Sequence, residues 1–152
     1  MLSQKAKYGI RALLYLARQS EGSPALIREI AEKERLPKRF LEAILLELKS
    51  AGILHSRAGK GGGYTLNRPP KTITLGRVIR LIDGPLAPIP CVSQTAYAPC
   101  KECSDERTCT IRAVMKQVRD ATAKILDETT FADLLDQENR LTRNPAGLDF
   151  NI

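Results

Sequence analysis

All four cysteines of this chain lie in one short segment, where their thiols could act together. They are Cys91, Cys100, Cys103 and Cys109, in the spacing C-x8-C-x2-C-x5-C. Thiolates bind iron–sulfur clusters and zinc, and exposed thiols also react with oxidants. Because structural disulfides are rare in reducing compartments, such clustering favours metal ligands or a redox sensor over a stabilising framework.

The same cysteines leave three alternatives open. Four thiolates suffice for a two-iron or a four-iron cluster, which we expect first. They also suit tetrahedral zinc, and Cys100-x2-Cys103 is a common zinc spacing. Nearby Lys101, Arg107 and Arg112 would lower thiol pKa values and so favour a metal-free thiol switch.

Charge divides the chain into two unlike parts. The 152 residues carry 24 Lys+Arg against 17 Asp+Glu, a net charge of +7. Residues 1–83 hold 16 of the basic and 7 of the acidic side chains, whereas the remainder is slightly acidic. This asymmetry predicts a front half that binds a polyanion and a rear half with another task.

The chain shows no sign of a membrane or secretory destination. Basic side chains interrupt residues 1–19, and no apolar run is long enough to span a bilayer. We therefore expect a cytoplasmic protein without a membrane partner.

The basic half reads as a helix-turn-helix. A first helix begins after Ser3, which is a good N-cap, and a short second helix centres on Ile30. Pro37 suits the first turn of a third helix that runs to about Lys49. Its apolar stripe has helical spacing and consists of Leu41, Ile44, Leu45 and Leu48. The basic entry to this third helix is typical of a DNA-recognition helix.

A glycine-rich hairpin follows. Residues 53–56 and 64–66 predict two short strands, and four glycines crowd the turn between them. Arg57 and Lys60 are the only charges there, as expected for a wing whose backbone approaches phosphates. A nucleotide-binding loop is disfavoured because these glycines lead into a strand rather than a helix.

Beyond the hairpin, Thr74 caps a helix that stops at Asp83-Gly84-Pro85. Prolines at 85, 88, 90 and 99 then forbid helix in the cysteine segment. The longest helix covers residues 110–127, and its stripe repeats every 3.5 residues, through Ile111, Met115, Val118, Thr122 and Ile125. Such a period favours packing against another long helix, which predicts a homodimer; packing on the chain's own front half is the alternative.

These elements predict a mainly α fold with a small β-hairpin wing, in which a winged helix-turn-helix domain carries a long dimerisation helix. The expected parts are a DNA-binding domain (1–83), a cysteine-bearing sensor loop (84–109), a dimerisation helix with a short following helix (110–138) and a tail (139–152). An enzyme is not expected, because one histidine is present and no nucleophile–base motif is recognisable.

The chain resembles bacterial regulators of the IscR, NsrR and CymR type, which are dimeric winged-helix repressors that often carry an iron–sulfur cluster. The likeness covers nearly the whole chain and is strongest at residues 3–9, 40–42, 57–64 and 74–85. It implies a double-stranded DNA operator as partner, with the third helix in the major groove and the wing in the minor groove. The residues it implies as DNA contacts are Ser3, Lys5, Tyr8, Lys38, Arg39, Phe40, Glu42, Arg57, Lys60, Gly61, Gly62, Gly63 and Tyr64.

For the cysteines, the resemblance matches Cys91, Cys103 and Cys109 to the three that cluster-binding relatives use, and leaves Cys100 as an extra thiol. IscR-type relatives have a histidine three residues after the last cysteine, where this chain has Arg112. NsrR-type relatives use an acidic residue on the first helix, near the place of Tyr8. Cys100 is thus the candidate fourth ligand, and we expect the state of this loop to set the affinity for DNA. Zinc, thiol oxidation or a partner protein are the alternative controls.

Overall fold

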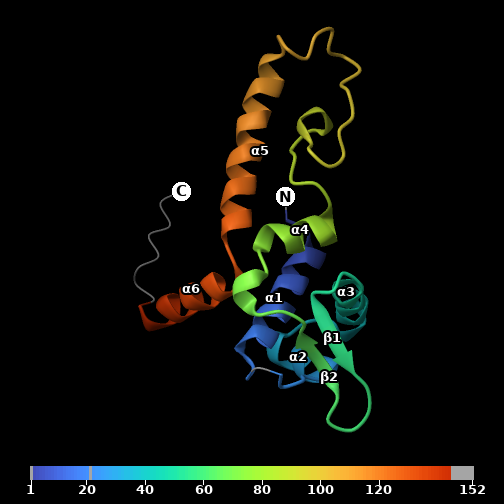
Figure 1. Ribbon diagram of the computed structural model, residues 1–152, viewed down its shortest axis with the longest axis vertical. Coiled ribbons are helices and arrows are strands. Elements are labelled where there is room, and N and C mark those ends of the chain that lie inside the picture. The colour runs from blue at the N-terminus through green and yellow to red at the C-terminus, as the bar shows by residue number, and fades with distance from the viewer. Residues whose placement is uncertain (1, 21, 145–152) are drawn as a thin grey trace.

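The computed structural model describes residues 2–20 and 22–144, and it has the expected mainly helical fold with one hairpin (Figure 1). The elements, in chain order, are α1 (Gln4–Arg18), α2 (Ile27–Glu34), α3 (Lys38–Ser50), β1 (Leu54–Arg57), β2 (Gly63–Leu66), η1 (Pro70–Thr72), α4 (Leu75–Asp83), η2 (Pro90–Val92), α5 (Thr110–Glu128) and α6 (Phe131–Arg143). No helix in this described part is both long and apolar enough to cross a membrane.

The core lies among α1, α2, α3 and the hairpin. The predicted stripe of α3 is buried in full, and Leu45 has no exposed surface. Ile30 of α2 and Leu13 of α1 lie in the same cluster, as helical spacing requires. Burial of these side chains fixes the outer face of α3 toward solvent.

Two predicted caps are confirmed. The Ser3 hydroxyl accepts a hydrogen bond from the Ala6 N–H at 2.9 Å, and Thr74 accepts one from the Arg77 N–H at 3.3 Å. Each cap satisfies an N–H that has no partner inside its helix.

The wing is an antiparallel hairpin in which Leu54 pairs with Leu66 and Arg57 pairs with Gly63. Its second strand is held to the α1–α2 connection, because Tyr64 and Ala25 exchange backbone hydrogen bonds at 2.8 and 3.0 Å. Gly63 has φ of 141°, and a Cβ there would lie 2.5 Å from the Ala25 carbonyl oxygen. Only glycine fits this close approach.

Helix α6 is longer than expected and continues past Glu138 to Arg143. It lies against α1, where Glu138 receives two hydrogen bonds from Arg18, at 2.5 and 2.9 Å. Thr130 caps it in a capping box with Asp133. Tertiary support of this kind lengthens a helix beyond what its polar sequence predicts. The remainder of the predicted tail lies outside the described residues.

We call α1, α2, α3, the hairpin and α4 the winged part. Helix α5 projects away from it, as Figure 1 shows, and none of the residues of α5 is buried. Ile111, Val118 and Ile125 of the predicted stripe are exposed, as is Val114. The stripe is therefore not covered by the winged part of the same chain. The connection between α5 and α6 is held to the chain at the start of α4, because the Leu75 N–H donates to the Thr129 carbonyl and the Phe131 N–H donates to the Ile73 carbonyl.

Candidate DNA-binding face and cysteine loop

The predicted site residues fall into three places. Most of the predicted DNA contacts lie on α3 and the wing, a smaller group lies at the start of α1, and the cysteines lie in the segment between α4 and α5 (Figure 1).

The first turns of α3 present exposed side chains of several chemistries. Lys38 and Arg39 are cationic, and Phe40 is 65% exposed, which is unusual for an aromatic residue. Glu42 is also exposed and approaches Lys38 at 4.0 Å, a distance at which the pair is weak. This face can offer cations to phosphates, and an apolar ring and an acceptor to base edges.

The wing extends the same basic surface. Arg57, at the end of β1, and Lys60, in the turn itself, are both exposed. Gly62 is buried under that turn and donates to the Gly59 carbonyl at 3.0 Å, and Gly61 has φ of 74°. Tyr64 is half-buried and packs on the core.

The predicted contacts on α1 are already engaged within the chain. Ser3 donates from its N–H to Asp83 at 2.9 Å and from its hydroxyl to the same carboxylate. Lys5 pairs with Glu47 of α3 at 2.5 Å, and Tyr8 is half-buried against the core. Ser3 and Lys5 thus hold the start of α1 against α4 and α3.

The four thiols differ in exposure. Cys91 is 6% exposed within η2, Cys100 is exposed, and Cys103 and Cys109 are intermediate. Among residues 2–20 and 22–144, no three cysteine, histidine or acidic side chains are close enough together to hold a metal ion. The structure thus has all four thiols free and not gathered around one point.

Two of the thiols interact directly. Burial raises the pKa of Cys103, and a hydrogen bond with the neighbouring Cys109 thiol raises it further. The pKa of Cys109 is lowered, first by the Arg112 N–H, which donates to its sulfur at 3.5 Å, and also by Cys103. Cys109 is therefore the more readily ionised of the pair.

Cys100 has a different neighbour. Its thiol donates to the Glu102 carboxylate at 3.2 Å. The Glu102 backbone N–H lowers the pKa of this thiol, but the hydrogen bond to the Glu102 carboxylate and that negative charge raise it overall. Of the three basic residues expected to activate this loop, Arg112 lowers the pKa of Cys109, and the shift of Cys100 is set mainly by Glu102.

The donor set fits a soft metal centre in kind. Four thiols on one loop, two of them near enough to shift each other's pKa, are the ligands that iron–sulfur clusters and structural zinc prefer. Residues 94–109 contain no helix or strand, so little regular structure there opposes a movement of the thiols toward one another.

Sequence reasoning missed one residue of this region. Arg119 donates to the Val92 carbonyl at 2.6 Å, although only Arg112 had been noted. The available signal was the seven-residue spacing of the two arginines, which places both on one side of α5.

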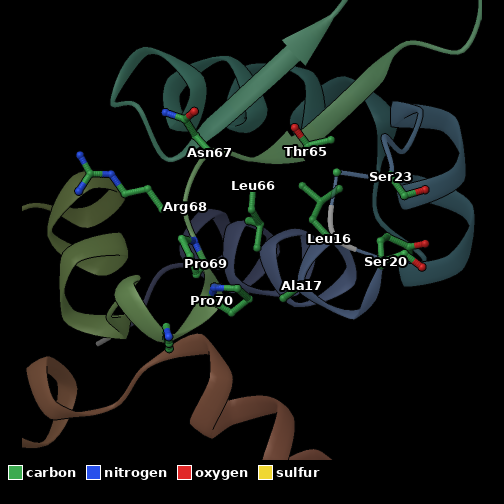
Figure 2. A pocket seen from close by; sticks show the side chains of 13 residues that line it. Leu16, Ala17, Ser20, Ser23, Thr65, Leu66, Asn67, Arg68, Pro69 and Pro70 are labelled. Atoms are coloured by element: carbon green, nitrogen blue, oxygen red, sulfur yellow. The ribbon is translucent and has the colours of Figure 1, made fainter.

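A separate hollow of about 490 Å³ lies between the end of α1, β2 and η1. Figure 2 shows Leu16, Leu66 and Pro69 along its wall, with Ser20 and Ser23 on one side and Arg68 on the other. It contains no cysteine and none of the predicted DNA contacts. Every buried polar side-chain atom of the described residues already has a hydrogen-bond partner, so none there awaits a ligand.

Comparisons with known proteins agree with this geometry. The profile of the Rrf2 family, described as an iron-dependent transcriptional regulator, matches residues 2–137. A Rhodobacter capsulatus protein named as an rrf2-like HTH-type transcriptional regulator is 44% identical over 138 residues, covering 89% of this chain and 92% of that protein.

Solved structures give the same result. CymR of B. subtilis, named as its global cysteine regulator, superposes with a TM-score of 0.75 at 29% identity, covering 90% of this chain and 97% of that one. IscR of T. potens superposes with a TM-score of 0.71 at 28% identity, covering 91% and 88%.

Proposed function

This chain belongs to the Rrf2 family of transcriptional regulators, and we propose that it is a dimeric regulator whose affinity for operator DNA is set by the chemical state of the Cys91–Cys109 loop. The observation that carries the proposal is the position of that loop. It is the stretch of chain that leads from α4, at the end of the winged part, to the start of α5.

On the DNA side, α3 enters the major groove. Lys38 and Arg39 contact phosphates or guanine edges, Phe40 contacts base edges, and Glu42 accepts from cytosine or repels a wrong base. Arg57 and Lys60 place the wing on the adjoining backbone, where the turn of Gly61, Gly62 and Gly63 allows close approach. Ser3, Lys5, Tyr8 and Tyr64 hold α1 and the wing in register with α3.

On the sensory side, Cys91, Cys100, Cys103 and Cys109 hold an iron–sulfur cluster. When bound, such a cluster supplies a group that responds to oxidants and to iron and sulfide supply. The chain's own contribution is to bring Cys91 and Cys100 to the Cys103–Cys109 pair. Cys109 is the N-cap of α5, so a movement of its sulfur acts at the first turn of that helix.

The two sides communicate through the dimer. The exposed stripe of α5 packs on the same helix of a second copy, which fixes the distance between two recognition helices. These must meet successive major grooves roughly 34 Å apart, so a small change in the loop alters DNA affinity.

A second candidate keeps the DNA-binding dimer but dispenses with the cluster. The effect of the Cys103 and Cys109 thiols on each other's pKa favours it, because neighbouring thiols form a disulfide when an oxidant takes up their two protons and two electrons. Zinc at the same four thiols, or a partner protein, are further forms of this alternative.

The DNA-binding part is tested by selecting duplexes from a random pool with the full-length protein. Arg39→Ala should weaken binding to the selected duplex about tenfold, and reduce the slope of log affinity against log salt by about one. Arg140→Ala removes an exposed arginine on α6 and serves as the control. Failure to select any duplex would contradict the proposed function.

The sensory part is tested by anaerobic purification with iron, sulfide and zinc analysis. Iron and sulfide with visible absorption support the cluster, stoichiometric zinc supports the zinc form, and a mobility change on oxidation supports the thiol switch. If Cys91→Ala and Cys103→Ala leave both the spectrum and the DNA affinity of this protein unchanged, the loop is not the sensor.

A further inference from the structure

The turn that carries Cys91 is held on α5 by two arginine side chains. Arg112 donates from Nε to the Cys91 carbonyl at 3.3 Å, and Arg119 donates from Nη1 to the Val92 carbonyl at 2.6 Å. The arginines are about two helical turns apart, and both therefore face η2. They satisfy carbonyls at the end of a short helix, which have no partner within it.

This contact coincides with the one buried stretch that the structure describes in the cysteine loop. Cys91, Val92 and Ser93 are buried in succession, whereas every residue from 94 to 102 is exposed. The Arg119 side chain is itself only 13% exposed. A hydrogen bond from a charged donor in such a sheltered place is stronger than one in open solvent.

Arg112 also reaches the other end of the loop. Its backbone N–H donates to the Cys109 sulfur at 3.5 Å, and its guanidinium lies 3.3 Å from the Glu106 carboxylate. One residue therefore touches the segments of the first and the last cysteine, which are otherwise separated by an exposed, irregular chain.

We propose that Arg112 and Arg119 are positioning residues, which dock the Cys91 turn onto α5 and keep its thiol sheltered. The proposal rests on the proposed function only in giving the loop a sensory role. Its consequence is that any movement of Cys91 toward the other thiols acts on α5 through these two side chains. Helix α5 then responds to a movement of Cys91 as well as to a movement of its own N-cap, Cys109.

The decisive experiment measures the alkylation rate of each cysteine in the reduced, metal-free, full-length protein, with iodoacetamide as the probe and peptide mass spectrometry as the readout. In Arg112→Gln and Arg119→Gln, Cys91 should react about tenfold faster, because a charged hydrogen bond that shelters it is lost. Cys100 is already exposed, so its alkylation rate should change less than about twofold.

Arg107→Gln is the matched control, since Arg107 lies in the same loop but pairs only with Asp105 of its own turn. It should leave the rate at Cys91 unchanged. Arg119→Lys keeps the charge and an N–H donor group but loses the planar fork of the guanidinium, so it should retain part of the protection.

A second readout is a titration of the same proteins with Co²⁺ alone, followed by thiolate-to-cobalt absorption. Loss of a residue that orients a ligand weakens metal affinity about 10- to 100-fold, whereas Arg107→Gln should not. An unchanged Cys91 rate, an equal rise at all four cysteines, or an equal loss of Co²⁺ affinity in the control would each overturn the proposal. If the wild-type protein takes up no metal and shows no response to oxidants, the sensory function fails, while the alkylation rates still decide the role of the arginines.

Discussion

The winged part and the cysteine-bearing part of this molecule differ in how far one copy of the chain completes them. In the winged part, α1, α2, α3 and the hairpin bury a continuous core, and α6 adds Phe131 to it. In the other part, α5 buries no residue and exposes Ile111, Val118 and Ile125, and the four thiols are free and are not gathered around one point. The first part has a hydrophobic core of its own, whereas the second exposes apolar side chains that have no partner within the described chain, and its thiols are free.

Leu45→Ala should produce the largest effect, because Leu45 is fully buried at the centre of the winged core. The cavity should lower the free energy of unfolding by about 2–5 kcal/mol, measured by urea denaturation. Leu46→Ala on the same helix is the control, since Leu46 is 58% exposed and should change stability by less than about 0.5 kcal/mol. Similar losses in both variants would show that the winged core is not the source of stability.

Val118→Asp should have the next largest effect, on association rather than folding. Val118 is exposed in the single chain, but a carboxylate there would be buried without a partner in a dimer of α5 helices. The dimer dissociation constant should rise at least about 100-fold, as measured by analytical ultracentrifugation. Gln117→Asp adds the same charge beside the stripe and should dimerise normally. Equal behaviour of the two variants would mean that the stripe is not the interface.

The same contrast explains what the sequence could predict. The α3 stripe, the Ser3 and Thr74 caps and the glycine hairpin depend on neighbours within a few residues, and all were found where the pattern indicated. The predicted end of α6, at residue 138, was wrong: the helix continues to Arg143, because α6 is held by contact with α1, which is far away in the chain. Periodicity carries no information about such partners.

In the cysteine loop, spacing predicted the chemistry of the ligands but not their arrangement. The nearby cations were expected to activate the thiols together, yet Glu102 raises the pKa of Cys100 while Arg112 lowers that of Cys109. The role of Arg119 depends on a backbone carbonyl 27 positions earlier, which no local pattern reveals.

Gly76→Ala should sharpen the comparison at the junction of the two parts. A Cβ on Gly76 would lie 2.1 Å from Oδ1 of Asp127, which pairs with Arg80 at 2.5 and 2.8 Å. Displacing this carboxylate should lower the free energy of unfolding, measured by urea denaturation, by about 1–3 kcal/mol. In an Asp127→Ala background the nearest remaining atom is Nη1 of the flexible Arg80 side chain, at 3.1 Å, so the same substitution should cost clearly less. A cost that is the same in both backgrounds would contradict a clash with Asp127.

The smallest effect should appear in the pH dependence of that ion pair. The hydrogen bonds from Arg80 hold the pKa of Asp127 below its ordinary value, against a smaller opposing effect of burial. A carboxylate whose pKa is lower in the folded than in the unfolded protein stabilises the fold at pH values above its unfolded pKa of about 3.9. This stabilisation is lost as the pH falls through the folded pKa. Because Asp127 is 44% exposed, Arg80→Gln should lower the free energy of unfolding at pH 7 by no more than about 1 kcal/mol.

This difference between Arg80→Gln and wild type should vanish at acid pH, where Asp127 is protonated in both proteins. Arg77→Gln is the control, since Arg77 lies on the same helix but reaches only the Ala51 carbonyl, at 3.5 Å. Urea denaturation of the three proteins between pH 2.5 and about 7 would measure it. A difference that persists at the acid end would mean that Arg80 stabilises the junction by packing. A vanishing difference would mean that α4 and α5 are joined by a weak, exposed charge pair, which a small change in the loop above can shift without disturbing the winged core.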